Sequence, residues 1–307
     1  PPILGGLLGV WGKWVKRAKY IYSVQDFNPE QTMAVGYSKN RLVLGTMMRL
    51  DKFSCKRADK VVVIGCDMAE TLKKRFNDKN VPPFAVINNW VNEKEIFPLP
   101  LADEKVRAFK RRHGLDDKFV IMYSGNIGLY YDLENLMRII ENFKAGTLAS
   151  DGREVAFAFV GAGSMLEQMV LYKEKNRMEN VFFIPYQDKS ELVYSLNAGD
   201  VHFCINAKGI KGVSVPSKCY GIMAAGRPVL AVLSEGTEAR LLVEKAGCGL
   251  CCEPGDYDAV ERNIRWFIEN AAADICREMG MNGRRYLEEH LTRDRSIRKY
   301  IDAMSDC

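Results

Sequence analysis

The segment between Gly212 and Val229 carries the residue types that hold phosphate groups. Pro216 and Gly226 predict a short helix that opens at the proline and ends before the glycine. Amides without partners at a helix start, together with the aligned peptide dipoles, attract anions. The hydroxyl and ammonium groups near this start belong to Lys211, Ser214, Ser217 and Lys218. We expect a diphosphate site here; the alternative is an ordinary capped helix of an α/β domain.

Two predicted strands, at 119–123 and 155–160, are each followed by a glycine-rich turn. The first turn is Gly125-Asn126-Ile127-Gly128, and the second is Gly161-Ala162-Gly163. Small residues at such turns let a backbone amide approach a phosphate. A dinucleotide fingerprint would need a further glycine where Leu166 stands, so these turns are weak evidence for a nicotinamide cofactor.

Several motifs in a fixed order resemble those of glycosyltransferase family 4, and of its bacterial WbuB-like branch, which builds O-antigen and capsule units. The resemblance covers essentially the whole chain. Besides 212–229, the motifs lie at 24–30, 86–91, 123–128, 159–163 and 183–186. The resemblance implies a retaining transferase that uses a UDP-sugar. It also implies the α/β fold called GT-B, which has two Rossmann-like, doubly wound parallel-sheet domains.

The resemblance also assigns donor-binding roles. It places Tyr186 and Gln187 beside the nucleobase, where the alternative is a plain loop, and it gives Glu238 a ribose contact, where the alternative is pairing with a helix dipole. The donor-binding residues expected on this basis are Gly125, Asn126, Gly128, Gly161, Gly163, Tyr186, Gln187, Lys211, Ser214, Pro216, Ser217, Lys218, Tyr220 and Glu238.

The chain departs from the family pattern at four positions. Most members carry two glutamates where Val213 and Gly221 stand, and an arginine and a lysine where Asn126 and Tyr131 stand. The positive charge that offsets the leaving diphosphate must therefore come from elsewhere. We expect it from Lys218 and Lys211, assisted by the helix start.

Carboxylates for the acceptor side are expected at the end of the strand predicted at 20–24. Asp26 and Glu30 follow this strand, and either can orient an acceptor hydroxyl; turn capping is the alternative. With Lys218, they are the predicted catalytic residues.

No metal or other cofactor is expected. Asp256-Tyr257-Asp258 has the spelling of a metal-binding pair, but it follows Pro254-Gly255 and fits a helix N-cap better. Cys248 and Cys251 have metal-type spacing without a second pair of ligands, and the chain has only three histidines. The nine cysteines cannot all pair and lie in apolar runs, which favours buried, reduced thiols.

The length of 307 residues accommodates two domains, and 47% hydrophobic residues support large cores. A net charge of +5 gives no nucleic-acid footprint. Strand and helix signals alternate, as in parallel sheets. The predicted strands are at 20–24, 60–64, 84–87, 119–123, 155–160, 181–184, 201–205, 229–233 and 249–252. We predict an acceptor-side domain at 1–98, a donor domain at 99–285, and at 286–307 a C-terminal helix and tail that cross back.

Apolar residues between 3 and 19 form one stripe at helical spacing, and lysines and an arginine gather toward the C-terminal end of the same stretch. The run is too short to span a membrane, which requires about 20 apolar residues. It suits a helix lying in an anionic membrane interface; the alternative is a helix that packs closely through its glycines. The chain opens at Pro1 without the strand and turn that begin this family. We therefore expect an incomplete N-terminal domain and impaired transfer.

The expected function is transfer of a sugar, an N-acetylhexosamine or its 6-deoxy form, from UDP to a lipid-linked or other saccharide acceptor. The expected location is cytoplasmic, on the inner face of the cytoplasmic membrane, in surface polysaccharide synthesis. The enzymatic alternative is a UDP-sugar 2-epimerase of the same fold. The non-enzymatic alternative is a transferase-like assembly subunit, which the substitutions at Val213 and Gly221 keep open.

Overall fold

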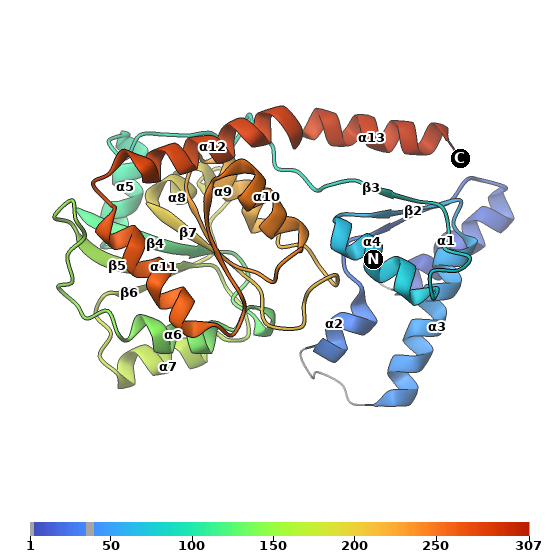
Figure 1. The fold of residues 1–307 in the computed structure, drawn as a ribbon, viewed down its shortest axis with the longest axis horizontal. Coiled ribbons are helices and arrows are strands. Elements are labelled where there is room, and N and C mark those ends of the chain that lie inside the picture. Colours follow the sequence, from blue (N-terminus) through green and yellow to red (C-terminus); the bar gives the residue numbers. More distant parts are fainter. Residues whose placement is uncertain (1–2, 35–39, 307) are drawn as a thin grey trace.

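The computed structural model describes residues 3–34 and 40–306, which form two α/β units side by side (Figure 1). The N-terminal unit has a parallel sheet in the order β1-β2-β3, made of β1 (Ile21–Val24), β2 (Lys60–Val63) and β3 (Phe84–Val86). All three strands lie where the sequence predicts them. The four helices before β3 are α1 (Ile3–Lys16), α2 (Asn28–Ala34), α3 (Arg41–Arg57) and α4 (Cys66–Arg75).

The sequence from Ser38 to Lys56 predicts a helix with a basic face. The helix found there, α3, begins at Arg41, where the side chain of Asn40 accepts the amides of Leu42 and Val43. Residues 38 and 39 lie outside the described residues. The short helix α2 is not predicted by the sequence, since residues 28–34 have no clear apolar period.

The C-terminal unit has a six-stranded parallel sheet in the order β6-β5-β4-β7-β8-β9. All six strands match the predicted positions within two residues. They are β4 (Lys118–Ser124), β5 (Glu154–Val160), β6 (Val181–Ile184), β7 (Val201–Ile205), β8 (Val229–Val232) and β9 (Gly249–Cys252).

Helices cover both faces of this sheet, as the doubly wound prediction requires. Along β4, Phe119, Ile121 and Tyr123 pack into one core, and Val120 and Met122 pack into the other. The connecting helices are α5 (Glu104–Arg112), η1 (Leu129–Tyr131), α6 (Leu133–Ile140), α7 (Leu166–Lys175), α8 (Leu192–Ala198), α9 (Lys218–Ala224), α10 (Glu238–Ala246) and α11 (Tyr257–Glu269).

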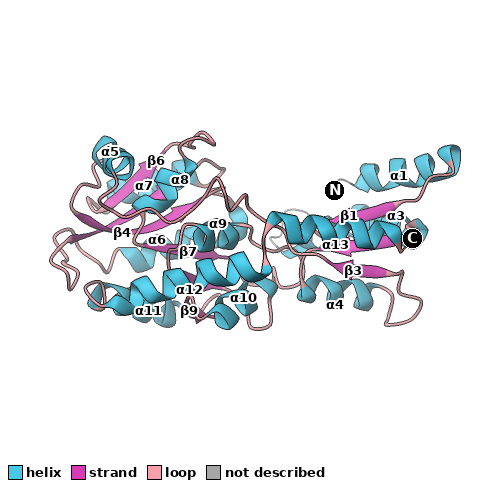
Figure 2. Cartoon of the chain, turned by 90° about the horizontal axis from the view of Figure 1, so that it is seen from above, coloured by secondary structure: helices cyan, strands magenta, loops and turns pink. Residues whose placement is uncertain are grey.

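The C-terminal helices α12 (Asp274–His290) and α13 (Arg293–Ser305) run from one unit to the other (Figures 1 and 2). A Cβ on Gly280 would lie 2.1 Å from the carbonyl oxygen of Gly226, so glycine allows α12 to pack this closely. Beyond it, the Ser296 hydroxyl donates to the Asn88 carbonyl at 3.1 Å. The Tyr300 and Ser23 hydroxyls lie 3.2 Å apart. The end of the chain thus contacts the N-terminal sheet.

The helix α1 packs on α3 through its glycines and leaves an apolar face uncovered. A Cβ on Gly6 would lie 2.7 Å from the Ser54 hydroxyl oxygen, and one on Gly9 would lie 2.3 Å from the Tyr20 ring. Large apolar side chains on the other side are exposed, with Trp14 at 80% and Trp11 at 61%. In the described part of the chain, no helix combines the length and apolarity needed to cross a membrane.

Candidate functional site

The strand order of the larger sheet creates a crevice at its middle. The chain winds outward from β4 through β5 to β6, and then returns to place β7 on the other side of β4. Ligands of doubly wound sheets bind at this switch point, beyond the carboxyl ends of the strands. The glycine turns after β4 and β5 both open onto this edge.

The glycines of these turns are required by close packing. Gly125, Gly161 and Gly163 have φ values of +139°, +144° and +159°, which side chains disfavour. A Cβ on Gly161 would lie 2.0 Å from the Gly125 carbonyl oxygen, and one on Gly163 would lie 2.1 Å from the Ile127 carbonyl oxygen. The turns are therefore stacked on each other.

The amides of Gly125 and Gly161 are engaged within the sheet edge. Gly125 donates to the Val160 carbonyl at 2.8 Å, and Gly161 donates to the Ile184 carbonyl at 2.9 Å. The sequence predicts that amides of this region bind a phosphate, but these two amides already donate to backbone carbonyls. Gly128, with φ −122°, has backbone geometry open to other residues.

A cavity of about 370 Å³ lies at this edge. Six predicted donor residues line it: Gly125, Gly161, Tyr186, Gln187, Ser217 and Lys218. Tyr186 is 78% exposed, which places its ring in contact with solvent. Trp90, Val91 and Ile96, which lie between β3 and α5, also line the cavity. None of them is a predicted site residue, although Trp90 and Val91 belong to the motif at 86–91.

The helix predicted to open at Pro216 begins later, at Lys218. The bridge between Ser214 and Asp26 keeps the preceding chain extended, so the turn into α9 comes after Pro216. The Ser217 side chain caps no amide of the helix. Gly226 ends the segment with φ +63°, as its position in the sequence predicts.

The Lys218 side chain enters the cavity edge between two tyrosine rings. Its Nζ lies 3.7 Å from the centroid of the Tyr131 ring and 5.1 Å from that of Tyr123. Burial lowers the pKa of the Lys218 ammonium to about 8, partly opposed by the nearby Cys204. This lysine is a cation held in apolar surroundings at the mouth of a crevice.

A buried histidine also lines the cavity. His202 of β7 is fully buried, and its Nε2 lies 2.8 Å from the Leu196 carbonyl oxygen, which fixes the proton on Nε2. Its Nδ1 is buried without a hydrogen-bond partner. Burial lowers the pKa of His202 to about 4, so the ring is neutral near pH 7. Its only signal in the sequence is a histidine within an apolar strand.

The other predicted donor residues lie outside the lining of this cavity. Lys211 donates to the carbonyl of Glu235, and Tyr220 is buried in the core shared by both units. The full set outside the lining is Asn126, Gly128, Gly163, Lys211, Ser214, Pro216, Tyr220 and Glu238. Several of them form the junction between the units instead.

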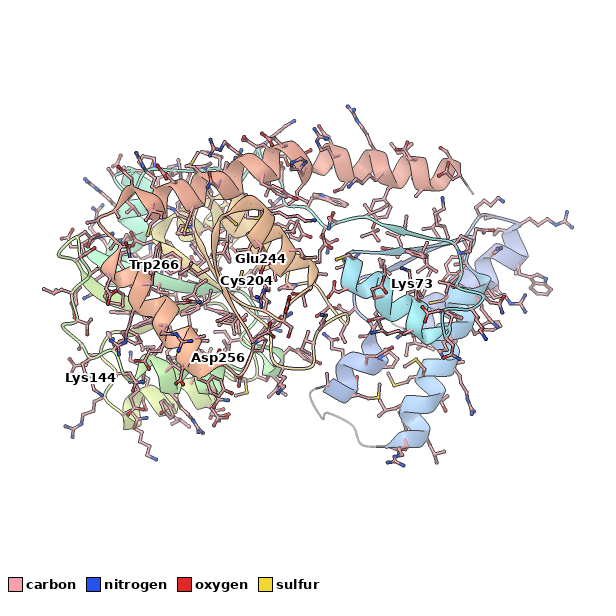
Figure 3. The ribbon with its side chains drawn as sticks, in the orientation of Figure 1. Lys73, Lys144, Cys204, Glu244, Asp256 and Trp266 are labelled. Atoms are coloured by element: carbon pink, nitrogen blue, oxygen red, sulfur yellow. The ribbon has the colours of Figure 1, made fainter. Side chains whose placement is uncertain are left out.

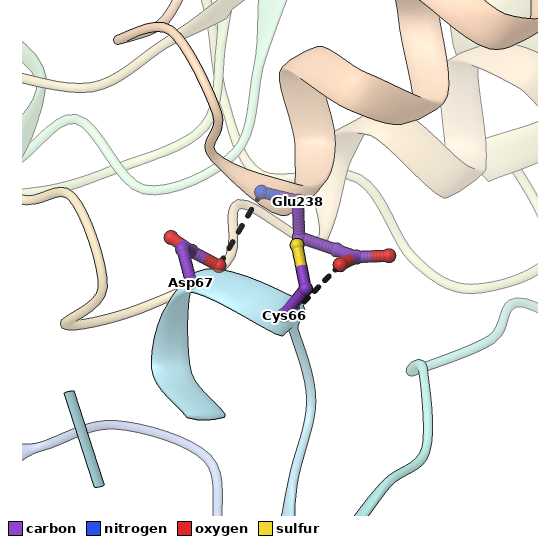
Figure 4. A group of neighbouring side chains, drawn as sticks. All are labelled: Cys66, Asp67 and Glu238. Carbon is purple, nitrogen blue, oxygen red and sulfur yellow. Dashed lines mark hydrogen bonds between the residues drawn. The ribbon is translucent and has the colours of Figure 1, made fainter. Parts of the chain in front are cut away.

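The junction contains a group of three polar side chains, Cys66, Asp67 and Glu238 (Figure 4). The Glu238 carboxylate accepts the Cys66 amide at 2.8 Å and the Asn88 side-chain amide at 2.7 Å. Asp67 accepts the Gly212 amide at 2.8 Å. Glu238 therefore binds the N-terminal unit in this structure rather than lining the donor cavity.

The two predicted acceptor-side carboxylates have different surroundings. Asp26 pairs in a bridge with Ser214, and burial raises the pKa of its carboxyl group. Glu30 forms a two-pronged ion pair with Arg75, which also pairs with the buried Asp51. The structure thus brings Asp26, and not Glu30, against the segment 212–229, through its bridge to Ser214.

The Asp256 carboxylate accepts the Ala259 amide at 3.0 Å, which confirms the N-cap interpretation of that acidic pair.

The eight cysteines in the described residues are free thiols. Figure 3 shows Cys204 inside the C-terminal unit, whereas Lys144 extends from its outer surface.

Comparison with known proteins agrees with this architecture. HepE of Anabaena, solved with UDP and glucose, superposes with a TM-score of 0.77 at 14% identity, over 99% of this chain and 76% of that one. WaaG, a glycosyltransferase involved in lipopolysaccharide biosynthesis, gives a TM-score of 0.67 at 12% identity, over 91% of this chain and 73% of that one. These similarities show the GT-B fold.

Two curated relatives are similar in sequence. The probable glycosyltransferase WbjE of Pseudomonas aeruginosa is 31% identical over 80% of this chain and 59% of its own length. The putative colanic acid biosynthesis glycosyl transferase WcaI of Escherichia coli is 26% identical over 93% of this chain and 67% of its own length. The family model "Glycosyl transferases group 1" matches residues 105–286, more than half of the chain. The chain therefore belongs to the group 1 glycosyltransferase family.

Proposed function

We propose that this chain binds a UDP-sugar in the cavity at the carboxyl ends of β4 and β5, as part of a retaining glycosyltransferase. The observation that carries the proposal is the position of Lys218, which lines the cavity together with one glycine from each of the two turns, Gly125 and Gly161. A cation at that place stabilises the negative charge that develops on a departing diphosphate. The UDP bound by HepE, a protein of the same fold, supports the choice of nucleotide.

In the proposed reaction, the acceptor oxygen replaces the UDP oxygen at the anomeric carbon. Charge then accumulates on the diphosphate, beside Lys218, and the acceptor hydroxyl gives its proton to the departing diphosphate oxygen. Asp26 lies at the junction of the two units, against Ser214. We assign it the role of orienting the acceptor hydroxyl, and no metal ion or other cofactor is assigned to the diphosphate.

The sugar and the acceptor are proposed from the resemblance to the WbuB-like branch of family 4. The sugar is an N-acetylhexosamine or its 6-deoxy form, and the acceptor is a lipid-linked saccharide of an O-antigen or capsule pathway. The colanic acid role in the name of WcaI supports a place in surface polysaccharide synthesis.

A lipid-linked acceptor requires contact with a membrane, and the exposed face of α1 is our candidate for it. Leu4, Leu8, Trp11 and Trp14 are exposed there, and Lys16 lies in the last turn. Tryptophan at headgroup level with lysine on anionic lipid is typical of interfacial helices. We propose peripheral attachment to the inner face of the cytoplasmic membrane.

Turnover of radiolabelled UDP-sugars, with and without a lipid-linked acceptor, tests the function. Acceptor-dependent transfer supports a transferase. Conversion of the donor to an epimer without acceptor would support the 2-epimerase alternative. Donor binding without either product would support a non-catalytic subunit. A Lys218→Met variant serves as the control, because it removes the cation from the cavity edge while keeping the length of the side chain.

A further inference from the structure

We propose that Tyr131 and Tyr123 form an aromatic box that positions the Lys218 ammonium for the diphosphate of the donor. The inference rests on the proposed function, because the diphosphate is that of UDP. It adds two positioning residues, neither of which is among the predicted donor-binding residues.

The geometry of the box is that of a cation–π site. The Lys218 Nζ lies 3.7 Å from the Tyr131 ring centroid and 5.1 Å from the Tyr123 centroid, both within the range of attraction by an aromatic face. The two rings lie 6.0 Å apart at 60° and support each other edge to face. The Tyr123 hydroxyl also donates to the Asn126 carbonyl at 2.6 Å, which ties the box to the first glycine turn.

Gly125 makes room for the lysine. A Cβ at this position would lie 2.5 Å from the Lys218 Cε. The absence of a side chain therefore lets Lys218 lie across the end of β4, between the glycine turn and the rings. Gly125 and Lys218 both line the cavity, so Lys218 links the two tyrosine rings to that space.

The groups that face Lys218 leave its charge without a carboxylate partner. They are Tyr123 from β4, Tyr131 from η1 and Cys204 from β7. The charge of Asp26 acts on Tyr131, and Cys219 interacts with Cys204. None of the ion pairs found among the described residues includes Lys218. Burial raises the pKa of Tyr131, so this ring stays neutral and cannot serve as a counterion.

Proton uptake follows from this arrangement. An ammonium that is desolvated and unpaired loses its proton more easily, and an arriving anion reverses the effect. The pKa of Lys218, about 8 without ligand, should therefore rise when a diphosphate binds. Part of the population is deprotonated near pH 8 and must take up a proton from solvent on binding.

Calorimetric titration with UDP, in buffers of different ionisation enthalpy, measures this uptake. With a pKa of about 8, we expect uptake of about half a proton at pH 8 and about a tenth at pH 7. Lys218→Arg should bind UDP without uptake, because the guanidinium stays charged. Lys218→Met should bind weakly and without uptake. Uridine, which lacks the diphosphate, should bind the wild-type protein without uptake.

A double-mutant cycle tests the box itself. Tyr131→Phe keeps the aromatic face, and should leave UDP affinity within about twofold of the wild type. Tyr131→Leu removes the face while staying apolar, and should weaken UDP binding by roughly three- to thirtyfold. In the Lys218→Met background, Tyr131→Leu should have no further effect, because the interaction it removes is already absent.

The outcomes separate the two proposals. Additive effects of Tyr131→Leu and Lys218→Met on UDP affinity would overturn the aromatic box and leave the proposed function standing. Equal uptake with uridine would also overturn it, since the diphosphate would not be the cause. Failure of the wild-type protein to bind UDP at any pH would overturn both.

Discussion

Asp67 and Glu238 cap each other's helices across the junction between the two units. The Glu238 carboxylate accepts an amide at the start of α4, and the Asp67 carboxylate accepts the Glu238 amide at the start of α10, at 3.3 Å (Figure 4). Each carboxylate therefore lies at the positive end of the other helix's dipole. Asp67 also accepts the Gly212 amide, at the start of the segment 212–229 that is predicted to bind phosphate.

Removal of this cap should destabilise the protein. Asp67→Ala leaves two amides without an acceptor and should lower the free energy of unfolding by about 1–3 kcal/mol, measured by urea denaturation. Asp67→Asn keeps a carbonyl acceptor. That oxygen can accept only one of the two amides, which bind different carboxylate oxygens in the wild type, so Asp67→Asn should keep only part of this stabilisation. Equal losses for the two variants would show that Asp67 does not act as an acceptor.

The pH dependence of stability should carry a signature of Lys218. Its pKa is lowered from 10.5 to about 8 in the folded chain, so between these values the unfolded chain binds more protons. Stability contributed by this group should therefore rise with pH from about 8 to 10.5, while UDP affinity falls. The measurement is the difference in urea midpoint between wild type and Lys218→Met across this range. A difference that does not change with pH would contradict the lowered pKa.

Donor binding should not need a divalent metal. If Lys218 neutralises the diphosphate, EDTA should leave the UDP dissociation constant unchanged within about twofold. Calorimetry before and after chelation, followed by addition of Mg²⁺ or Mn²⁺, gives the comparison. Loss of binding in EDTA that either ion restores would instead indicate a diphosphate bridged by metal.

The exposed face of α1 should bind anionic vesicles. Trp11→Ser with Trp14→Ser removes its aromatic side chains and should reduce co-sedimentation severalfold, and moderate salt should weaken attachment of the wild type. Leu171→Ser provides the control, because Leu171 is 59% exposed on α7 of the other unit. Equal binding by the tryptophan variant and the control would return α1 to a packing role only.

Elements with strong local patterns could be predicted from the sequence, whereas contacts between distant segments could not. The strands were predictable because each is a short apolar run between turn residues. The glycines at 125 and 161 were predictable as turn residues, but the stacking of one turn on the other depends on the register of β4 and β5.

The same limit applies to the site. Lys218 was predictable as a cation near a helix start, yet its tyrosine box joins β4, η1 and α9, which only the fold brings together. Pro216 predicted a helix start that was too early. The helix begins later because Ser214 forms a bridge with Asp26 of the other unit, a contact that leaves no trace in the local sequence. Glu30 could not be distinguished from Asp26 until Arg75 was seen beside it.

UDP titration of Lys218→Ala and Lys211→Ala tests the central claim most directly. Both variants remove one lysine of the same sequence segment, but only Lys218 lines the cavity, while Lys211 donates to the Glu235 carbonyl. Charge-assisted contacts contribute roughly 1.5–3 kcal/mol, so Lys218→Ala should weaken UDP binding by about ten- to a hundredfold. Lys211→Ala should stay within about twofold of the wild type. Unchanged UDP affinity in a folded Lys218→Ala variant would contradict the account.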